Sequence, residues 1–349
     1  MESLTAQRKI NLCRMLLVDV AGTMILMASA GLVAAQSQAQ PTSEKPMAPL
    51  PKTVPAPKEN PTTPEKITLG KLLFFDPRLS GNNKMSCATC HAPDKAFGDG
   101  VPQGKGAAGN TLKRNAPSLL NVGFNSSFFW DGREKSLEAQ ALLPIQAVDE
   151  MNQDLDELEK ELNAVGAYVK QFQAVFSTKV TRDGIAKALA AFERTLVTLP
   201  SPYDHYLGGE KDALSPEAKR GMEIFFGDAG CARCHQGPLL SDEKFYRLGF
   251  TNDKGRGLVT GKTEDNYKFR TPSLRNVSRT GPYMHDGSHK TLDEVLFFYL
   301  RGVQNAAADG LSLDIESLQG VALDEIPDLI AFLEALTGEL PKIAPPELP

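Results

Sequence analysis

Two short stretches, Cys87-Ala-Thr-Cys90-His91 and Cys231-Ala-Arg-Cys234-His235, decide the interpretation of this sequence. In a CxxCH motif the two thiols are spaced to bind the two vinyl groups of one haem, and the adjacent imidazole reaches the iron. A redox-active or metal-binding CxxC that happens to precede a histidine is the alternative, but two copies in one chain favour haem attachment. We therefore predict two covalently bound haem c groups, with His91 and His235 as iron ligands.

The composition excludes several other classes of protein. The chain has 349 residues, of which 41% are hydrophobic and 23% are charged, and this suits one large or two ordinary globular domains. Five cysteines are too few for a disulfide scaffold. The formal net charge of −5 argues against a nucleic-acid-binding protein.

The N-terminus carries the pattern of an export signal. Basic residues up to Arg14 precede an apolar run that ends in Val33-Ala34-Ala35. This pattern is typical of a secretory signal peptide over residues 1–35, which would place the mature protein in the periplasm. An uncleaved membrane anchor is the alternative, because about 20 apolar residues can span a bilayer. Residues 36–62 are rich in proline and are expected to form an extended linker, with folded structure beginning near Thr63.

The remainder of the chain contains an internal repeat. The stretch from Pro117 to Glu138 matches the stretch from Pro272 to Asp293 without a gap, at a constant offset of 155. Two copies of this size indicate two homologous domains. Each CxxCH motif also follows a similar helix-start pattern of a hydroxyl residue, a proline and a glutamate. The two copies of that pattern are Thr63-Pro64-Glu65 and Ser215-Pro216-Glu217.

Most other signals are helical. Apolar residues recur at helical spacing over 154–176, 185–199 and 327–336, and long alternating strands are missing. We therefore predict an all-α fold of two helical domains, each with one haem, joined by long loops. The expected boundaries are residues 63–205 for the N-terminal domain, 206–341 for the C-terminal domain and 342–349 for a tail.

The first haem lacks an obvious second iron ligand. Between His91 and His205 the chain has no other histidine, and the only methionine in that interval is Met151. A haem with one protein ligand usually binds oxygen species, whereas a closed position suits electron transfer. The haem of His91 is therefore the candidate reaction site.

The repeat suggests a different environment for the second haem. At the offset of 155, Pro144 of the first half corresponds to Tyr299 of the second. A tyrosine phenolate can bind haem iron, whereas a proline cannot. From spacing alone, Tyr299 is explained equally well as a core aromatic residue.

Several motifs together resemble the bacterial di-haem cytochrome c peroxidase and MauG family. The resemblance extends from Thr63 to about Leu336 and includes both CxxCH motifs. It implies two cytochrome c-like helical domains with a calcium ion between them. The other motifs that carry it are Arg114–Asn121, Phe129–Arg133, Ser201–Asp204, Phe269–Asn276 and Pro282–Gly287.

The resemblance implies roles for individual residues. Trp130 matches the tryptophan between the two haems, and Glu150 matches the distal acid of the peroxide pocket. Gln140 and Pro144 match pocket positions of the MauG branch. A calcium ion would be held mainly through carbonyl oxygens, in agreement with its preference for oxygen ligands. The positions that match its ligands are Asn115, Thr280 and Pro282.

Two departures from the wider family favour the MauG branch. Where other members place a methionine on the second haem, this chain has Tyr299. The loop 101–111 also lacks the histidine that closes the first haem in those members. The resemblance therefore implies that Tyr299 binds the second iron and that the first haem stays open.

Three functions follow as hypotheses from the resemblance. The first is an exported peroxidase that reduces hydrogen peroxide at the N-terminal haem, with electrons from a small exported cytochrome or copper protein relayed through the C-terminal haem. The second is a MauG-like oxidase that modifies tryptophan or other side chains of a partner protein. The third is a non-catalytic di-haem electron carrier, which the open first haem argues against. A homodimer is compatible with each.

Overall fold

Each half of the chain begins with a helix that its sequence predicts. Helix α1 (Pro64–Phe75) follows Thr63, and helix α8 (Pro216–Phe226) follows Ser215. In both cases the hydroxyl accepts a hydrogen bond from a backbone N–H of the first turn. The two predicted helix starts are confirmed, because capping depends on a few adjacent residues.

The structure, a computed structural model, describes residues 47–249, 251–301, 314 and 321–349. The predicted signal segment, residues 1–35, lies outside the described residues. The described residues belong to one compact unit. Across these residues, no helix has both the length and the apolar character needed to cross a membrane.

The first helix of each half packs closely against a later helix. Helix α1 crosses α6 (Arg182–Glu193), and α8 crosses α11 (Ile326–Glu334). A side chain at Gly70 would collide with the backbone of α6, and one at Gly221 would collide with the backbone of α11. Glycine at these two points therefore sets the distance between the helices.

The repeat extends to the three-dimensional structure. Helices α3 (Leu137–Gln146) and α10 (Leu292–Leu300) begin 155 residues apart. Asn121 and Asn276, also 155 apart, both adopt the left-handed conformation, with φ of 60° and 61°. The isolated bridges that precede α3 and α10 are likewise equivalent, and they pair Phe128 with Glu134 and Tyr283 with His289.

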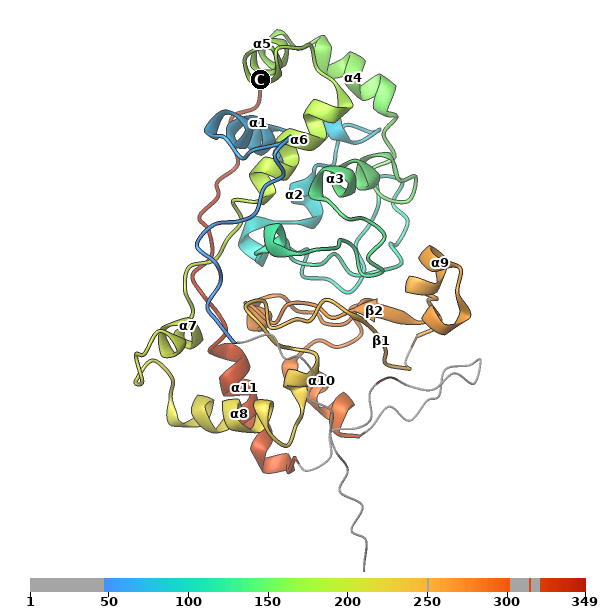
Figure 1. Cartoon of the computed structure of the whole chain (residues 1–349). Coiled ribbons are helices and arrows are strands. Elements are labelled where there is room, and N and C mark those ends of the chain that lie inside the picture. The colour runs from blue at the N-terminus through green and yellow to red at the C-terminus, as the bar shows by residue number, and fades with distance from the viewer. Residues whose placement is uncertain (1–46, 250, 302–313, 315–320) are drawn as a thin grey trace, which may run out of the picture. The chain divides into compact units, whose positions relative to one another are not determined.

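The hydrophobic residues form two clusters. The first surrounds α1, α3 and α6, where the rings of Phe74 and Phe192 lie 5.0 Å apart. The second surrounds α8 and α11, where the rings of Phe225 and Phe332 lie 5.1 Å apart. Figure 1 shows these two groups of helices. The fully buried residues of the first cluster end at Leu196 and those of the second begin at Tyr203, close to the predicted boundary at residue 205.

Two of the helical patterns in the sequence form helices whose bounds differ from those expected. The apolar pattern over residues 154–176 forms two helices, α4 (Leu155–Asn163) and α5 (Gly166–Phe176). The first ends at Asn163, whose side chain bonds to Val180. The pattern over 185–199 forms α6, which ends earlier than expected. The other helices are α2 (Cys87–Cys90), α7 (Pro202–Leu207) and α9 (Arg256–Thr260).

The structure also contains a small sheet. Strands β1 (Phe245–Arg247) and β2 (Lys268–Arg270) pair in antiparallel orientation, with Phe245 opposite Arg270. The fold is therefore rich in helix, with one two-stranded sheet among the described residues.

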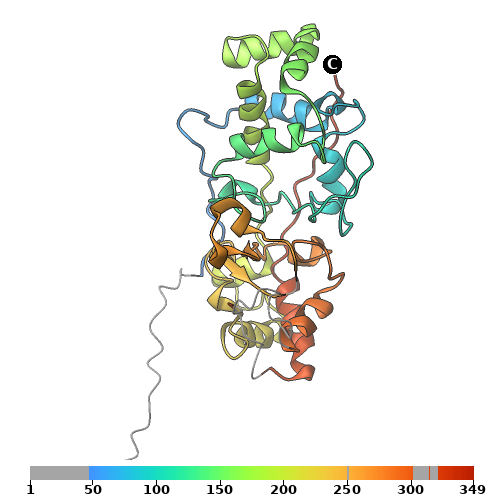
Figure 2. The ribbon, with the colours of Figure 1, turned by 90° about the vertical axis from the view of Figure 1, so that its right-hand side faces the viewer.

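The segments at both ends of the described chain lie against the helices. Asn60 is fully buried, accepts a hydrogen bond from Lys66 Nζ and donates one to Glu138 Oε1. Ordered contacts thus begin before Thr63, because this amide bonds to both the buried Lys66 and the half-buried Glu138. At the other end, the Arg78 guanidinium donates a hydrogen bond of 2.9 Å to the carbonyl of Pro349. Figure 2 shows the C-terminal segment (red) running back towards the first group of helices.

Candidate active site

The first CxxCH motif forms a single helical turn that orients its histidine. Ser86 caps α2, and the backbone N–H of His91 bonds to the Cys87 carbonyl oxygen. His91 Nδ1 lies 3.1 Å from the carbonyl oxygen of Phe97. Since a carbonyl oxygen only accepts, Nδ1 carries the proton and Nε2 keeps its lone pair for a metal. Burial lowers the pKa of His91, which favours the neutral ring that a metal requires.

The second CxxCH motif has the same arrangement. The backbone N–H of His235 bonds to the Cys231 carbonyl oxygen, and His235 Nδ1 lies 2.9 Å from the carbonyl oxygen of Leu240. Burial also lowers the pKa of His235. Both motifs therefore present a neutral imidazole whose Nε2 is available.

The four thiols do not have the character of redox-active cysteines. Burial raises the pKa of Cys90 to about 11 and that of Cys231 to about 12, and it also raises the pKa of Cys87 and Cys234. A reactive CxxC instead has a lowered thiol pKa. None of the four forms a disulfide. Two half-buried thiols on one turn, followed by an oriented imidazole, fit the attachment of haem c.

Glu150 lies near the first cysteine pair. It interacts electrostatically with Cys90, and its carbonyl oxygen accepts a 2.7 Å hydrogen bond from the backbone of Ala107. Burial raises the pKa of Glu150, the charge of Asp149 adds to this increase, and the charge of Arg133 opposes it. A carboxyl group with a raised pKa suits the transfer of a proton near neutral pH.

Gln140 and Pro144 lie one turn apart on α3, so they share a face of the helix. Both are half-buried. The Pro144 carbonyl oxygen accepts a hydrogen bond from the backbone of Met151, which joins α3 to the turn that contains Glu150. These three predicted pocket residues therefore belong to one local unit.

Tyr299 lies near the second cysteine pair. It occupies the position on α10 that Pro144 occupies on α3. Burial raises the pKa of Tyr299, and electrostatic interactions with Cys231 and Cys234 raise it further. At this equivalent position, α3 therefore has a proline, which cannot bind iron, and α10 has a phenol.

Trp130 lies where the two halves meet. Its Nε1 donates a 2.9 Å hydrogen bond to the Asn115 carbonyl oxygen, and its own carbonyl oxygen accepts a 2.8 Å bond from the backbone of Arg270. The backbone of Asn115 in turn donates a 2.8 Å bond to the carbonyl oxygen of His285. Trp130 is thus bonded to both halves of the chain, through its side chain to Asn115 and through its backbone to Arg270.

The three predicted calcium positions lie on neighbouring segments. The Asn115 side-chain amide donates to the carbonyl oxygens of Val101 and Pro102, so its oxygen faces away from them. Thr280 and Pro282 lie on the segment that leads to His285, where the peptide bond between Gly281 and Pro282 is cis. Within the described chain, no group of three or more His, Cys, Asp or Glu side chains could hold a metal ion. A calcium ion here would therefore depend on amide and carbonyl oxygens.

Two further side chains near the cysteine pairs belong to no recognisable sequence motif. Glu193, at the end of α6, interacts electrostatically with Cys87, and burial raises its pKa to about 8. Its Oε2 atom has no hydrogen-bond partner. Tyr246, on β1, donates a 2.7 Å hydrogen bond to Asp242 beside Cys234. Only the folded chain brings these side chains to the cysteines.

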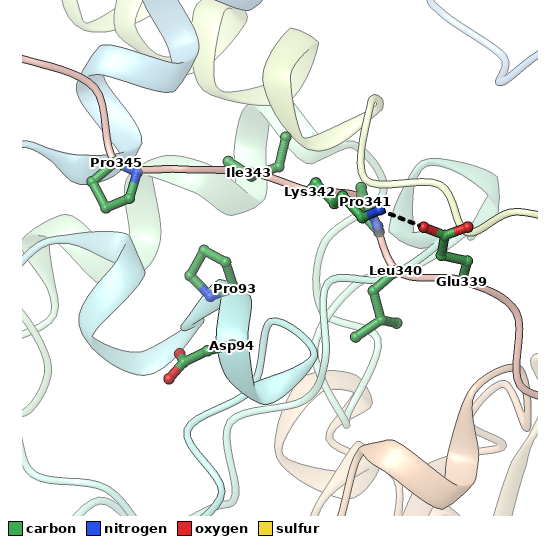
Figure 3. A pocket seen from close by; sticks show the side chains of 8 residues that line it. All are labelled: Pro93, Asp94, Glu339, Leu340, Pro341, Lys342, Ile343 and Pro345. Atoms are coloured by element: carbon green, nitrogen blue, oxygen red, sulfur yellow. Dashed lines mark ion pairs between the residues drawn. The ribbon is translucent and has the colours of Figure 1, made fainter.

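An open pocket of about 570 Å³ lies elsewhere, under the C-terminal segment. Figure 3 shows Leu340 and Ile343 of that segment on one side and Pro93 and Asp94 on the other. An ion pair between Glu339 and Lys342 borders it. None of the predicted site residues lines this pocket, so it is not part of the candidate active site.

The chain is similar to known proteins over most of its length. A family model described as di-haem cytochrome c peroxidase matches residues 64–212. The methylamine utilization protein MauG of Methylorubrum extorquens is 42% identical over 305 residues, which cover 86% of this chain and 86% of that protein. The cytochrome-c peroxidase IdrP1 of Pseudomonas sp. (strain SCT) is 38% identical over 353 residues, which cover 91% of this chain and 92% of that protein.

A solved structure extends the similarity to three dimensions. A MauG-like protein associated with microbial copper homeostasis is similar with a TM-score of 0.73 and 34% identity, over 83% of this chain and 95% of that chain. The resemblance inferred from the motifs is confirmed by these relatives. The chain belongs to the di-haem cytochrome c peroxidase family, and it is an oxidoreductase that uses peroxide and carries haem c.

Proposed function

We propose that this peroxidase has two unlike haem sites and belongs to the tyrosine-ligated, MauG-like branch. Cys87, Cys90 and His91 hold the first haem, in a domain of residues 63–205, and leave its distal side to substrate. Cys231, Cys234, His235 and Tyr299 hold the second haem, in a domain of residues 206–341. The observation that carries the proposal is the exchange of Pro144 for Tyr299 at equivalent positions of α3 and α10.

Haems held at these residues would supply an iron for peroxide binding at the first site and an iron for electron exchange at the second. Glu150 moves a proton between the two peroxide oxygens, so that water leaves. Its raised pKa supports this role, since burial makes the carboxylate a better proton acceptor than an ordinary glutamate. Gln140 and Pro144 line the same pocket and exclude other ligands from the distal side.

Trp130 transfers electrons between the two sites. Its hydrogen bond to the Asn115 carbonyl oxygen fixes the plane of the indole at the junction of the halves. A calcium ion held by Asn115, Thr280 and Pro282 stabilises the same junction. The hard oxygen atoms of these residues suit that ion.

The N-terminal signal exports the protein to the periplasm, where a small cytochrome or copper protein supplies electrons. A second candidate function is the oxidation of side chains on a partner protein. Tyr299 favours this alternative, because a phenolate stabilises the oxidised state of the iron it binds. A purely electron-carrying role is disfavoured by the half-buried Glu150, with its raised pKa, at the first site.

Addition of peroxide to the fully oxidised holoprotein tests the proposal. A stable species oxidised by two electrons is expected, together with one high-spin and one low-spin iron in the resting electron paramagnetic resonance spectrum. A protein that reacts with peroxide only after one haem has been reduced would instead behave like the family members that have a methionine on the second haem. A haemochrome assay that finds fewer than two covalent haems would contradict the proposal.

A further inference from the structure

A second tyrosine, Tyr246, lies near the second cysteine pair. Its hydroxyl donates a 2.7 Å hydrogen bond to Asp242 Oδ2, and the phenol interacts electrostatically with the Cys234 thiol. Tyr299 also interacts with Cys234, so this cysteine has a tyrosine from α10 and another from β1 as neighbours. Tyr299 has a proposed role as an iron ligand, whereas the proposed function assigns no role to Tyr246.

Asp242 is fixed against the same cysteine. Its backbone N–H donates a 2.8 Å hydrogen bond to the Cys234 carbonyl oxygen, and its Oδ1 accepts one of 3.0 Å from the backbone of Lys244. The carboxylate is 8% exposed. The Lys244 ammonium lies 4.0 Å from Oδ2, too far for a hydrogen bond. Among the described residues, the Tyr246 hydroxyl is therefore the group that donates a short hydrogen bond to Asp242 Oδ2.

A phenol beside an oxidising group loses its electron most easily when its proton can move at the same time. Burial and the bond to Asp242 raise the pKa of Tyr246, so the hydroxyl keeps its proton at neutral pH. The carboxylate at 2.7 Å is an acceptor already in position. The Asp242 backbone bonds to Cys234, which would carry a thioether bond to the haem, so this cysteine connects the phenol to the second haem site.

We propose that Tyr246 is a redox-active residue of the second haem site. The inference rests on the proposed function, which supplies a haem pair oxidised by peroxide. Tyr246 gives one electron to that oxidised pair, and its phenolic proton passes to Asp242 Oδ2. The products are a neutral tyrosyl radical and a protonated carboxyl group. An external one-electron reductant then restores the phenol, and Asp242 returns the proton. Because Tyr246 is half-buried, the radical lies near enough to solvent for such a reductant.

Electron paramagnetic resonance of the oxidised holoprotein, frozen after addition of one equivalent of peroxide, tests the proposal. A narrow organic radical signal is expected, and it should narrow further when the protein contains ring-deuterated tyrosine. This isotope test needs no substitution, so it does not depend on the folding of a variant. Tyr246→Phe should abolish the signal. Asp242→Asn, which keeps the shape but removes the proton acceptor, should also lose it at neutral pH.

Tyr206→Phe is the matched control, because Tyr206 on α7 packs against the second cluster with its ring 4.6 Å from Lys211 Nζ. The signal should persist in this variant. A radical of unchanged intensity in Tyr246→Phe would overturn the proposal. A haem pair that peroxide oxidises without any radical would overturn it and leave the proposed function intact. A haem pair that peroxide does not oxidise would overturn both.

Discussion

Replacement of Glu150 by glutamine should slow the cleavage of peroxide without preventing its binding. Glutamine has nearly the same size as glutamate but cannot exchange a proton between the two peroxide oxygens. Positioned acid–base groups contribute about 10²–10⁴-fold to a rate. At 1.36 kcal/mol for each factor of ten, this corresponds to about 3 to 5 kcal/mol of activation free energy.

The surroundings of Glu150 determine the pH dependence of the same step. Burial raises the pKa of this carboxyl, Asp149 raises it further and Arg133 lowers it. The pKa of this carboxyl therefore lies above its ordinary value, and the rate in the wild type should change as the group titrates. Asp149→Asn is a matched control, because Asp149 is exposed and its substitution removes only a neighbouring charge. This variant should shift the pH profile downwards and keep most of the activity.

Stopped-flow absorbance of the holoprotein mixed with peroxide measures both effects. The reasoning about Glu150 would be refuted if Glu150→Gln reacted within about twofold of the wild-type rate, since general acid–base catalysis is worth at least about a hundredfold. An unchanged pH profile in Glu150→Gln would refute it independently. Equal haem content in the three proteins ensures that the comparison concerns chemistry.

Three further predictions concern the second haem site, the packing of two helices and a buried carboxyl group. Tyr299→Phe should alter the low-spin electron paramagnetic resonance signal and leave the high-spin signal unchanged, and an effect on both would contradict separate roles. Gly221→Ala should lower the free energy of unfolding by about 1 to 3 kcal/mol because of the collision with α11, whereas Gly166→Ala, which meets no atom within 4 Å, should not. The folded state raises the pKa of Glu193 from 4.5 to about 8, so it keeps a proton that the unfolded chain loses. Stability should therefore fall as the pH rises between these values, with a slope approaching about 1.4 kcal/mol per pH unit, and Glu193→Gln should flatten that slope.

The parts of the fold that follow from local sequence were predictable. The start of α1 depends on Thr63 and the residues directly after it, and the start of α8 depends on Ser215 and the residues directly after it. The repeat was visible because equivalent residues keep one offset through loops as well as helices. It predicted that Pro144 and Tyr299 would be equivalent, and the bounds of α3 and α10 agree.

Contacts between segments far apart in the chain were not predictable from the local sequence pattern. The proline-rich stretch before Thr63 has the composition of a linker, yet Asn60 is buried because Lys66 and Glu138 require a polar partner between them. Tyr246 lies on a strand of three residues, too short to show an alternating pattern. Its position beside Cys234 depends on pairing with β2, more than twenty residues later.

The junction of the two halves shows how the duplication creates an asymmetric site. Asn115 and Arg270 are equivalent in the repeat, as are Trp130 and His285. The backbone of Asn115 donates to the His285 carbonyl oxygen, and the backbone of Arg270 donates to the Trp130 carbonyl oxygen, each at 2.8 Å. These reciprocal bonds are those of an interface between two similar copies related by a two-fold axis.

Side chains break this symmetry where the backbone keeps it. Trp130 Nε1 bonds to the Asn115 carbonyl oxygen, whereas the ring of His285 stacks on Phe269 at 3.8 Å and bonds to Thr251. Burial lowers the pKa of His285 to about 4, so this ring stays neutral at the junction. An indole is far more readily oxidised than a neutral imidazole. A single substitution at one of two equivalent positions would therefore be enough to give the junction one readily oxidised ring, as the proposed electron relay requires, because the repeated backbone holds both positions at the junction.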